Sequence, residues 1–247
     1  MNTRDVLWTG GWDSTFRILS LLAEGEDFIQ PHYILNPERL SYSLELQAIE
    51  RISSLAVARW GERLRPLLQT NLADIPVTDL ARDRHAVLVK RFAIGPQYLW
   101  LSEYARSMVA QPVELCIHVD DKAYSVLKSL KDEPLGPDSP DGGDARRLIA
   151  DHFTFPILEV SKVDMLHAAR RDGYEDLMNL TWFCQIPTPS KTPCGFCNPC
   201  EWTVDEGLKY RVPLDRRIRL ALYRNFVAKL PGWRLRQSLL ALLRSAR

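Results

Sequence analysis

The sequence lacks any apolar run that approaches the ~20 consecutive residues needed to span a bilayer. Residues 1–11 also lack a basic segment followed by an apolar one, which is the pattern of a secretory signal. We therefore expect a cytoplasmic protein with no membrane partner.

Two further features of the composition narrow the class of protein. The charged fraction is 26% and the hydrophobic fraction is 46%, a balance that excludes a mainly disordered chain. Cysteine is scarce, with five residues in 247, and a chain of this length buries enough surface to fold without disulfides. The composition predicts a globular protein with a sizeable core.

Charge is unevenly distributed, although the net charge is only +1. Residues 208–247 carry eleven Lys or Arg and one acidic residue, Asp215, whereas residues 1–207 carry 21 basic and 30 acidic side chains. The basic tail is expected to form amphipathic helices, one opening at Pro213 and the last spanning residues 233–247. These helices either pack on the protein with a solvated basic face, or contact nucleic acid or another subunit.

Four of the five cysteines fall within 17 residues. They are Cys184, Cys194, Cys197 and Cys200, and spacings this short let loops place several sulfurs around one ion. Four thiolates predict a structural Zn²⁺ site, because a tetrahedral ion with four protein ligands keeps no open position for water. The fifth, Cys116, lies in an apolar run and is either a buried thiol or a sulfur carrier.

Strand and helix patterns alternate along most of the chain. This alternation predicts an α/β fold with a parallel sheet flanked by helices on both faces. The expected strands are residues 5–8, 28–35, 113–119 and 155–160, and the expected helices include 16–24 and 43–60. Residues 131–144 are rich in proline, glycine and acidic side chains, and they are expected to form a surface loop or a lid.

One segment between a strand and a helix has the composition of a phosphate-binding loop. Its residues are Trp8, Thr9, Gly10, Gly11, Trp12, Asp13, Ser14 and Thr15. The glycines let the backbone approach an anion, the helix N-terminus offers unpaired N–H groups, and the hydroxyls add donors. Asp13 is a candidate Mg²⁺ ligand, and Trp12 is a candidate wall of a nucleotide site. No lysine follows the glycines, so the loop is neither GxxxxGK[ST] nor GxGxxG.

Residues 9–15, Thr-Gly-Gly-Trp-Asp-Ser-Thr, resemble the SGGxDS pyrophosphate loop (PP-loop) of the N-type ATP pyrophosphatases. Residues 181–184 and 194–200 resemble the T-x-S-C and C-G-x-C-x-x-C ending of the 7-cyano-7-deazaguanine synthase family. Residues 155–162 resemble the P-L-x-x-x-x-K stretch of that family, which makes Lys162 the candidate for the missing phosphate-binding lysine. The resemblance covers residues 4–208 and leaves out the basic tail.

The resemblance implies a Rossmann-like fold of the adenine nucleotide α-hydrolase type. It divides the chain into a PP-loop ATP pyrophosphatase domain at 1–180, a four-cysteine zinc-binding lobe at 181–212 and a basic helical extension at 213–247. It also implies ATP as co-substrate, Mg²⁺, structural Zn²⁺ and a homodimer.

The activity implied by the resemblance is that of an ATP-dependent carbon–nitrogen ligase of queuosine biosynthesis. Such an enzyme adenylates the carboxylate of 7-carboxy-7-deazaguanine and converts it with ammonia to the amide and the nitrile. It releases pyrophosphate and AMP (or ADP-level products). Asp13, Ser14 and Lys162 are the implied catalytic residues, while residues 8–15 are the implied nucleotide-binding segment.

The chain departs from the family at the segments associated with the deazaguanine. Phe183 stands where the family has Ser, no R-N pair occurs in residues 92–98, and D-Y-S-G-Y-P-D is only echoed in residues 121–125. Two alternatives therefore stay open: a divergent relative that adenylates another carboxylate, and a PP-loop tRNA-modifying enzyme whose basic tail binds RNA. Further candidates near ATP or substrate are Arg39, Glu45, His118, Asp120 and Asp121.

Overall fold

The computed structural model describes residues 2–25, 27–108, 112–121, 123–132 and 143–225. Most of the loop expected at residues 131–144 and the whole helix expected at 233–247 lie outside the described residues. No helix within the described ranges is long and apolar enough to cross a membrane.

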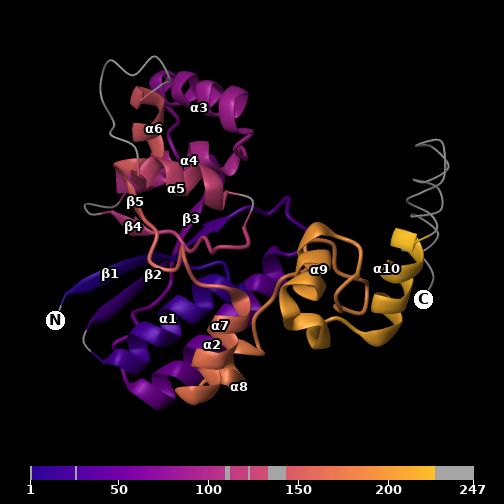
Figure 1. Cartoon of the computed structure of the whole chain (residues 1–247). Helices are drawn as coiled ribbons and strands as arrows, with labels where there is room; N and C mark the ends of the chain where they lie inside the picture. The colour runs from indigo at the N-terminus through magenta and orange to yellow at the C-terminus, as the bar shows by residue number, and fades with distance from the viewer. Residues whose placement is uncertain (1, 26, 109–111, 122, 133–142, 226–247) are drawn as a thin grey trace.

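A five-stranded parallel sheet forms the centre of the protein (Figure 1). The strands are β1 (Thr3–Leu7), β2 (Phe28–Leu35), β3 (Leu68–Asn71), β4 (Val113–Glu114) and β5 (Phe153–Thr154). Their order across the sheet is β3-β2-β1-β4-β5. The chain moves outward from β1 through β2 to β3 and then returns to the other side of β1, so the strand order reverses between β1 and β4.

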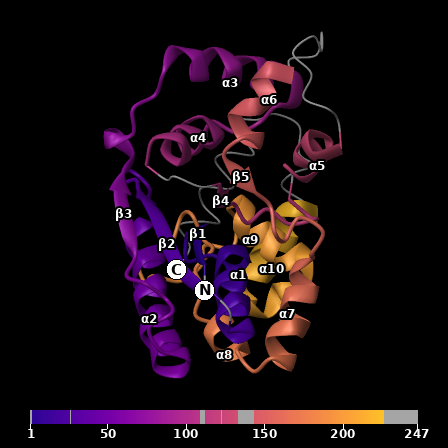
Figure 2. The same cartoon turned by 90° about the vertical axis from the view of Figure 1, so that its left-hand side faces the viewer.

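Helices cover both faces of the sheet, which confirms the expected α/β architecture. The helices are α1 (Trp12–Glu24), α2 (Tyr42–Trp60), α3 (Asp79–Phe92), α4 (Gln97–Met108), α5 (Tyr124–Asp132), α6 (Gly143–Ala150), α7 (Lys162–Arg171), α8 (Glu175–Met178), α9 (Asn198–Thr203) and α10 (Leu214–Asn225). Helices α1, α2, α7 and α8 lie on one face and α3 to α6 on the other (Figures 1 and 2). Each face has its own hydrophobic core, and the neighbours Val6 and Leu7 of β1 belong to opposite cores, as the alternation of a strand requires.

Two of the expected strands differ in the structure. We predicted strands at 113–119 and 155–160. The first is shorter than expected, since β4 has only two residues, and the second prediction is wrong, because β5 covers Phe153–Thr154 and ends before residue 155. Residues 156–159 form turns, beginning at Pro156, which has no N–H to contribute to a sheet. The apolar side chains are buried by these turns, and an apolar run without alternation does not distinguish that arrangement from a strand.

Helix α1 begins directly after the glycines of the loop. Gly11 is its N-cap, with an extended backbone, and Gly25 ends it in the left-handed conformation (φ +83°) with its N–H bonded to the Leu21 carbonyl. We expected the helix from residue 16, so Asp13 to Thr15 lie in its first turn instead of in a preceding loop. Trp12, Asp13 and Ser14 therefore contribute unpaired N–H groups at the helix start, whereas the Thr15 N–H donates to the Gly11 carbonyl at 3.2 Å.

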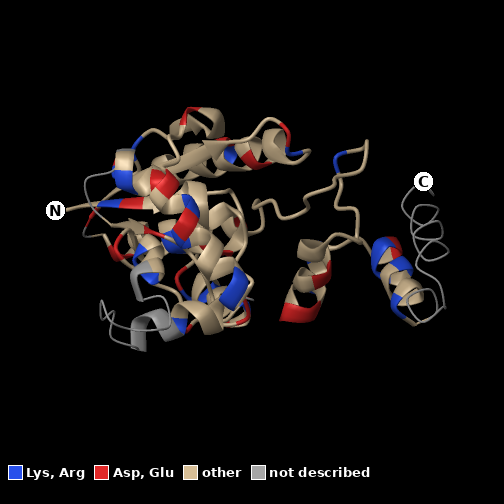
Figure 3. Ribbon diagram, turned by 90° about the horizontal axis from the view of Figure 1, so that it is seen from above, with Lys and Arg blue, Asp and Glu red and all other residues tan. Residues whose placement is uncertain are grey.

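Residues 181–225, here called the C-terminal lobe, have a small core of their own. Its buried members are Cys184, Cys194, Phe196, Cys197 and Cys200. Basic side chains are concentrated on α10 (Figure 3), but Arg224 forms an ion pair with Asp205 at 2.8 Å. Part of the basic charge of α10 is thus neutralised within the lobe.

Candidate active site

The candidate site lies at the carboxyl ends of the strands, where the strand order reverses. The loop after β1 and the segment after β4 meet there, and this crevice is where open parallel sheets bind ligands. Two cavities adjoin at this place, the first of about 300 Å³ and the second of about 450 Å³. Both are lined by Thr9, Asp13, Arg39 and Gln185. The β1–α1 loop is therefore part of the wall of both cavities.

Gly10 allows this loop to lie against helix α2. Its φ of +68° falls in the left-handed region, which side chains other than glycine rarely adopt. A Cβ atom at this position would lie 2.8 Å from the carbonyl oxygen of Glu45 and 3.1 Å from Cγ1 of Ile49. The fold itself thus requires glycine here, independently of any ligand.

The hydroxyl groups of the loop have two different surroundings. Ser14 Oγ accepts a hydrogen bond from the Thr9 N–H at 3.3 Å, so these two residues close the loop onto the helix start. Thr15 is fully buried, and its Oγ1 accepts the indole N–H of Trp8 at 2.8 Å. Trp8 and Thr15 support the loop from the core, while Trp8 also lines the second cavity.

Lys162 lies beside this loop, although the two are far apart in the sequence. The helix that carries it begins with a capping box, in which Ser161 Oγ accepts the Asp164 N–H and the Asp164 carboxylate accepts the Ser161 N–H. The box makes Lys162 the first residue of α7 and turns its side chain toward the first cavity, where Nζ lies 4.0 Å from Asp13 Oδ1.

Asp13 has an oxygen that is available to a ligand. Its Oδ1 is buried and accepts no hydrogen bond from any residue within the described ranges. Two basic side chains lie near it, with Lys162 Nζ at 4.0 Å and His118 Nε2 at 3.9 Å. A carboxylate oxygen with free lone pairs beside a phosphate-type loop fits Mg²⁺, which prefers carboxylates and phosphate oxygens.

Glu206 pairs with Lys162, and sequence reasoning did not identify it. Lys162 Nζ lies 2.7 Å from Glu206 Oε2, and both side chains line the first cavity. Burial disfavours the charged lysine, but Asp13 and Glu206 outweigh this effect and raise the pKa of Lys162. Burial also raises the pKa of Glu206, against the opposing effect of Lys162.

A kink between two helical turns, at residues 204–208, places Glu206 at this point, and Glu206 and Gly207 have non-helical backbone angles there. Gly207 has a φ of +88° there, and a Cβ atom on it would lie 2.9 Å from Cγ2 of Val163. The kink therefore packs directly on the first residues of α7. The sequence signal was a glycine shortly after the last cysteine, which by itself does not reveal the contact with α7.

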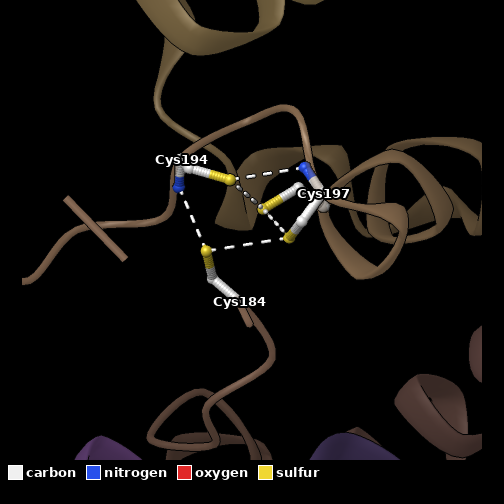
Figure 4. A group of neighbouring side chains, drawn as sticks. Cys184, Cys194 and Cys197 are labelled. Atoms are coloured by element: carbon white, nitrogen blue, oxygen red, sulfur yellow. Dashed lines mark hydrogen bonds between the residues drawn. The ribbon is translucent and has the colours of Figure 1, made fainter. Parts of the chain in front are cut away.

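The four clustered cysteines form a site that can hold a metal such as zinc (Figure 4). All four Sγ atoms lie within 4.8 Å of one another and are buried, with Cys184–Cys197 at 3.8 Å and Cys194–Cys200 at 3.9 Å. Zn–S bonds of about 2.3 Å place tetrahedral sulfurs about 3.8 Å apart, so the spacing fits this ion. The N–H groups of Cys194 and Cys197 donate to sulfur at 3.2 and 3.3 Å.

The C-terminal lobe is joined to the β1–α1 loop through Trp182. The backbone N–H of Trp182 donates to the Gly10 carbonyl at 2.8 Å, and its indole N–H donates to the Cys184 carbonyl at 2.7 Å. One residue thus links a metal ligand to the loop. Order at the cysteine cluster is expected to hold the loop in place.

The other candidates have distinct roles. Glu45 is buried and accepts hydrogen bonds from Arg39, Ser41 and Tyr33 at 2.6, 2.7 and 2.8 Å, so it anchors the wall of the cavity. His118, Asp120 and Asp121 all line the first cavity, as the sequence suggested.

Cys116 lines the second cavity. Burial raises the pKa of its thiol well above the ordinary value, with the carboxylates of Glu114 and Asp13 adding to the effect. A sulfur carrier needs an accessible thiolate, which a raised pKa disfavours. Cys116 is only partly buried, and it is the raised pKa of its thiol that speaks against the sulfur-carrier interpretation.

No protein-family model matches the chain, and no curated protein matches its sequence. What the site can do is therefore argued from its own geometry. That geometry places a glycine loop, a carboxylate and a lysine around one pair of cavities, with the four-cysteine cluster joined to the loop through Trp182.

Proposed function

We propose that the protein is an ATP-dependent carbon–nitrogen ligase that adenylates a carboxylate and resembles 7-cyano-7-deazaguanine synthase. The observation that carries the proposal is the position of the β1–α1 loop, whose Thr9 and Asp13 line both cavities. A nucleotide on one side of the loop and an acceptor on the other would meet there.

The second cavity is the better place for the nucleoside. It lies over the ends of β1 and β2 and has apolar and aromatic walls that include Leu7, Ile34 and Trp100. The phosphates would then reach the loop and the N-terminus of α1, whose N–H groups and dipole favour anions. The first cavity, which contains Lys162 and His118, remains for the acceptor.

In the proposed reaction, an oxygen of the acceptor carboxylate attacks the α-phosphorus of ATP, and the bond to the β-phosphate breaks to release pyrophosphate. Ammonia attacks the acyl carbon, AMP leaves, and a proton is lost to give the amide. A second ATP activates the amide oxygen in the same way, and loss of AMP and a proton gives the nitrile. Each step places negative charge on leaving phosphates, which fixed donors and cations stabilise.

The residues at and beside the β1–α1 loop have separate parts in this scheme. Lys162 would neutralise the leaving pyrophosphate, since its charge is retained and its Nζ lies near the loop. Asp13 would hold Mg²⁺, which supplies further positive charge to the phosphates when bound. Ser14 orients the loop through Thr9. Four cysteine ligands leave no open position on Zn²⁺, so its role is structural.

The test is a mass-spectrometric assay with ATP, Mg²⁺, ammonium and 7-carboxy-7-deazaguanine, in which AMP and the base are followed together. We expect AMP and the amide or nitrile to accumulate together, and Lys162→Met to lower the rate about 100-fold or more. Lys128→Met, which removes an exposed lysine on α5, is the matched control and should not change the rate.

Other outcomes of this assay are equally informative. AMP formation only with a different carboxylate would identify a divergent relative. AMP formation only with tRNA, with binding that weakens steeply as salt rises, would identify an RNA-modifying enzyme. A protein that forms no AMP with any of these acceptors would overturn the proposal.

A further inference from the structure

Arg211 has surroundings that its place in the sequence does not suggest. Its guanidinium lies over the rings of Trp12 and Phe183, with its central carbon 4.9 Å from each ring centroid. Its Nη2 donates to the carbonyl and hydroxyl oxygens of Thr181 at 2.6 and 2.7 Å. Two rings and one threonine therefore hold the guanidinium in a single orientation.

The charge of Arg211 has no carboxylate partner within the described part of the chain, and its hydrogen-bond acceptors there are neutral. Burial lowers the pKa of Arg211 to about 10, against the weaker opposing effects of Tyr210 and Asp13. Arg211 is half-buried, and a partly desolvated cation without a counter-ion is unfavourable, so a bound anion would relieve this cost.

The remaining N–H groups of Arg211 are suited to an oxyanion. A guanidinium has five N–H groups, and the two on Nη2 are occupied by Thr181. The N–H groups on Nε and Nη1 have no acceptor among the described residues. Each of these nitrogens can donate a charge-assisted hydrogen bond to an oxygen of a carboxylate.

Arg211 lines the first cavity and not the second. The first cavity also contains Trp202 and Trp182, whose rings can pack against a flat ligand. The positive charge at the loop already comes from Lys162 and from the start of α1, so Arg211 is separate from the groups assigned to pyrophosphate.

We propose that Arg211 recognises the carboxylate of the acceptor in the first cavity and so makes the site specific for flat aromatic acids. The inference rests on the proposed function, because it places the nucleotide in the second cavity. Arg211 would act before the chemical step, holding the acid at the loop.

Binding experiments on the zinc-loaded full chain test this inference without turnover. The probes are 7-carboxy-7-deazaguanine, indole-3-carboxylate and benzoate, each compared with its carboxamide, and ATP with Mg²⁺ is titrated separately. The variants are Arg211→Gln and Arg211→Lys. Arg63→Gln is the matched control, since Arg63 also donates to a main-chain carbonyl, that of Leu22, but lies outside both cavities.

We expect the wild type to bind at least one carboxylate more tightly than its amide. Arg211→Gln should weaken binding of that carboxylate about tenfold or more, because a charge-assisted hydrogen bond is lost. Arg211→Gln should bind the amide and ATP as tightly as the wild type does. The carboxylate affinity of Arg211→Lys should lie between those of the wild type and Arg211→Gln, and the carboxylate affinity of Arg63→Gln should equal the wild-type value. Circular dichroism and zinc content confirm that each variant is folded.

Two results would overturn the inference. The first is that no carboxylate in the panel binds more tightly than its amide. The second is that Arg211→Gln weakens the binding of ATP as much as the binding of the acid, which would assign the guanidinium to the nucleotide. Failure of the proposed function appears differently, as carboxylate binding that depends on Arg211 without any AMP formation.

Discussion

Substitution of Gly10 by alanine tests whether the close packing of the β1–α1 loop on α2 requires glycine at this position. Gly10 and Gly25 both have positive φ, +68° and +83°, but their surroundings differ. A Cβ atom on Gly10 would meet the Glu45 carbonyl oxygen at 2.8 Å, whereas one on Gly25 would meet only Nη1 of Arg63, at 3.9 Å. Gly25→Ala is therefore the matched control for Gly10→Ala.

The expected magnitudes follow from these contacts. A left-handed alanine costs about 1 to 2 kcal/mol in either variant, which lowers Tm by about 2 to 8 °C in a chain of this size. The loss of glycine entropy from the unfolded state offsets about 0.4 to 1 kcal/mol, equally in both. Gly10→Ala bears a further overpacking cost of about 1 to 3 kcal/mol, unless the loop moves away from α2.

The assay combines thermal unfolding with the rate of AMP formation. Gly25→Ala should be mildly destabilised and fully active. Gly10→Ala should have the lower Tm of the two and should lose about 10- to 100-fold in rate, because displacement of the loop misplaces the phosphates. Equal Tm values and equal rates for the two variants would refute the reasoning, since the Glu45 contact would then have no effect.

Two further predictions concern the C-terminal lobe and pH. Cys194→Ser or Cys197→Ser should lose bound zinc and destabilise the lobe. Either variant should also weaken ATP binding, because Trp182 joins this lobe to the Gly10 carbonyl. Metal analysis and calorimetry measure these effects, and Cys116→Ser is the control that keeps its metal. Retention of full ATP affinity without metal would contradict the link. Burial raises the pKa of Glu206 above its ordinary 4.5, so the folded state binds more protons and its stability falls as pH rises through the raised pKa. The free energy of unfolding, measured with urea between about pH 4 and pH 7, should therefore decline less with rising pH in Glu206→Gln than in the wild type. The same pH dependence in both proteins would show that Glu206 does not contribute to it.

Much of the local structure followed from residue pattern alone. The strand at 28–35, the helix ended by Gly25 and the four-cysteine cluster were all predicted from the sequence. These features depend on interactions between residues near one another in the chain, such as helix capping, strand patterning and closely spaced sulfurs. Short-range backbone preference and side-chain chemistry are sufficient to specify them.

The candidate site depended on tertiary structure for its most specific parts. The contact of Glu206 with Lys162, the enclosure of Arg211 by Trp12 and Phe183, and the close approach of Gly10 to Glu45 join segments far apart in the sequence. The two short strands after residue 112 likewise depended on where turns could bury apolar side chains. The sequence by itself determined which chemical groups the protein carries. It also determined, for most of these groups, the strand or helix at whose end they lie. Only the packing of the C-terminal lobe against the sheet decided which of those groups face the same cavity, because burial and pairing of charges are set by contacts that no local pattern encodes.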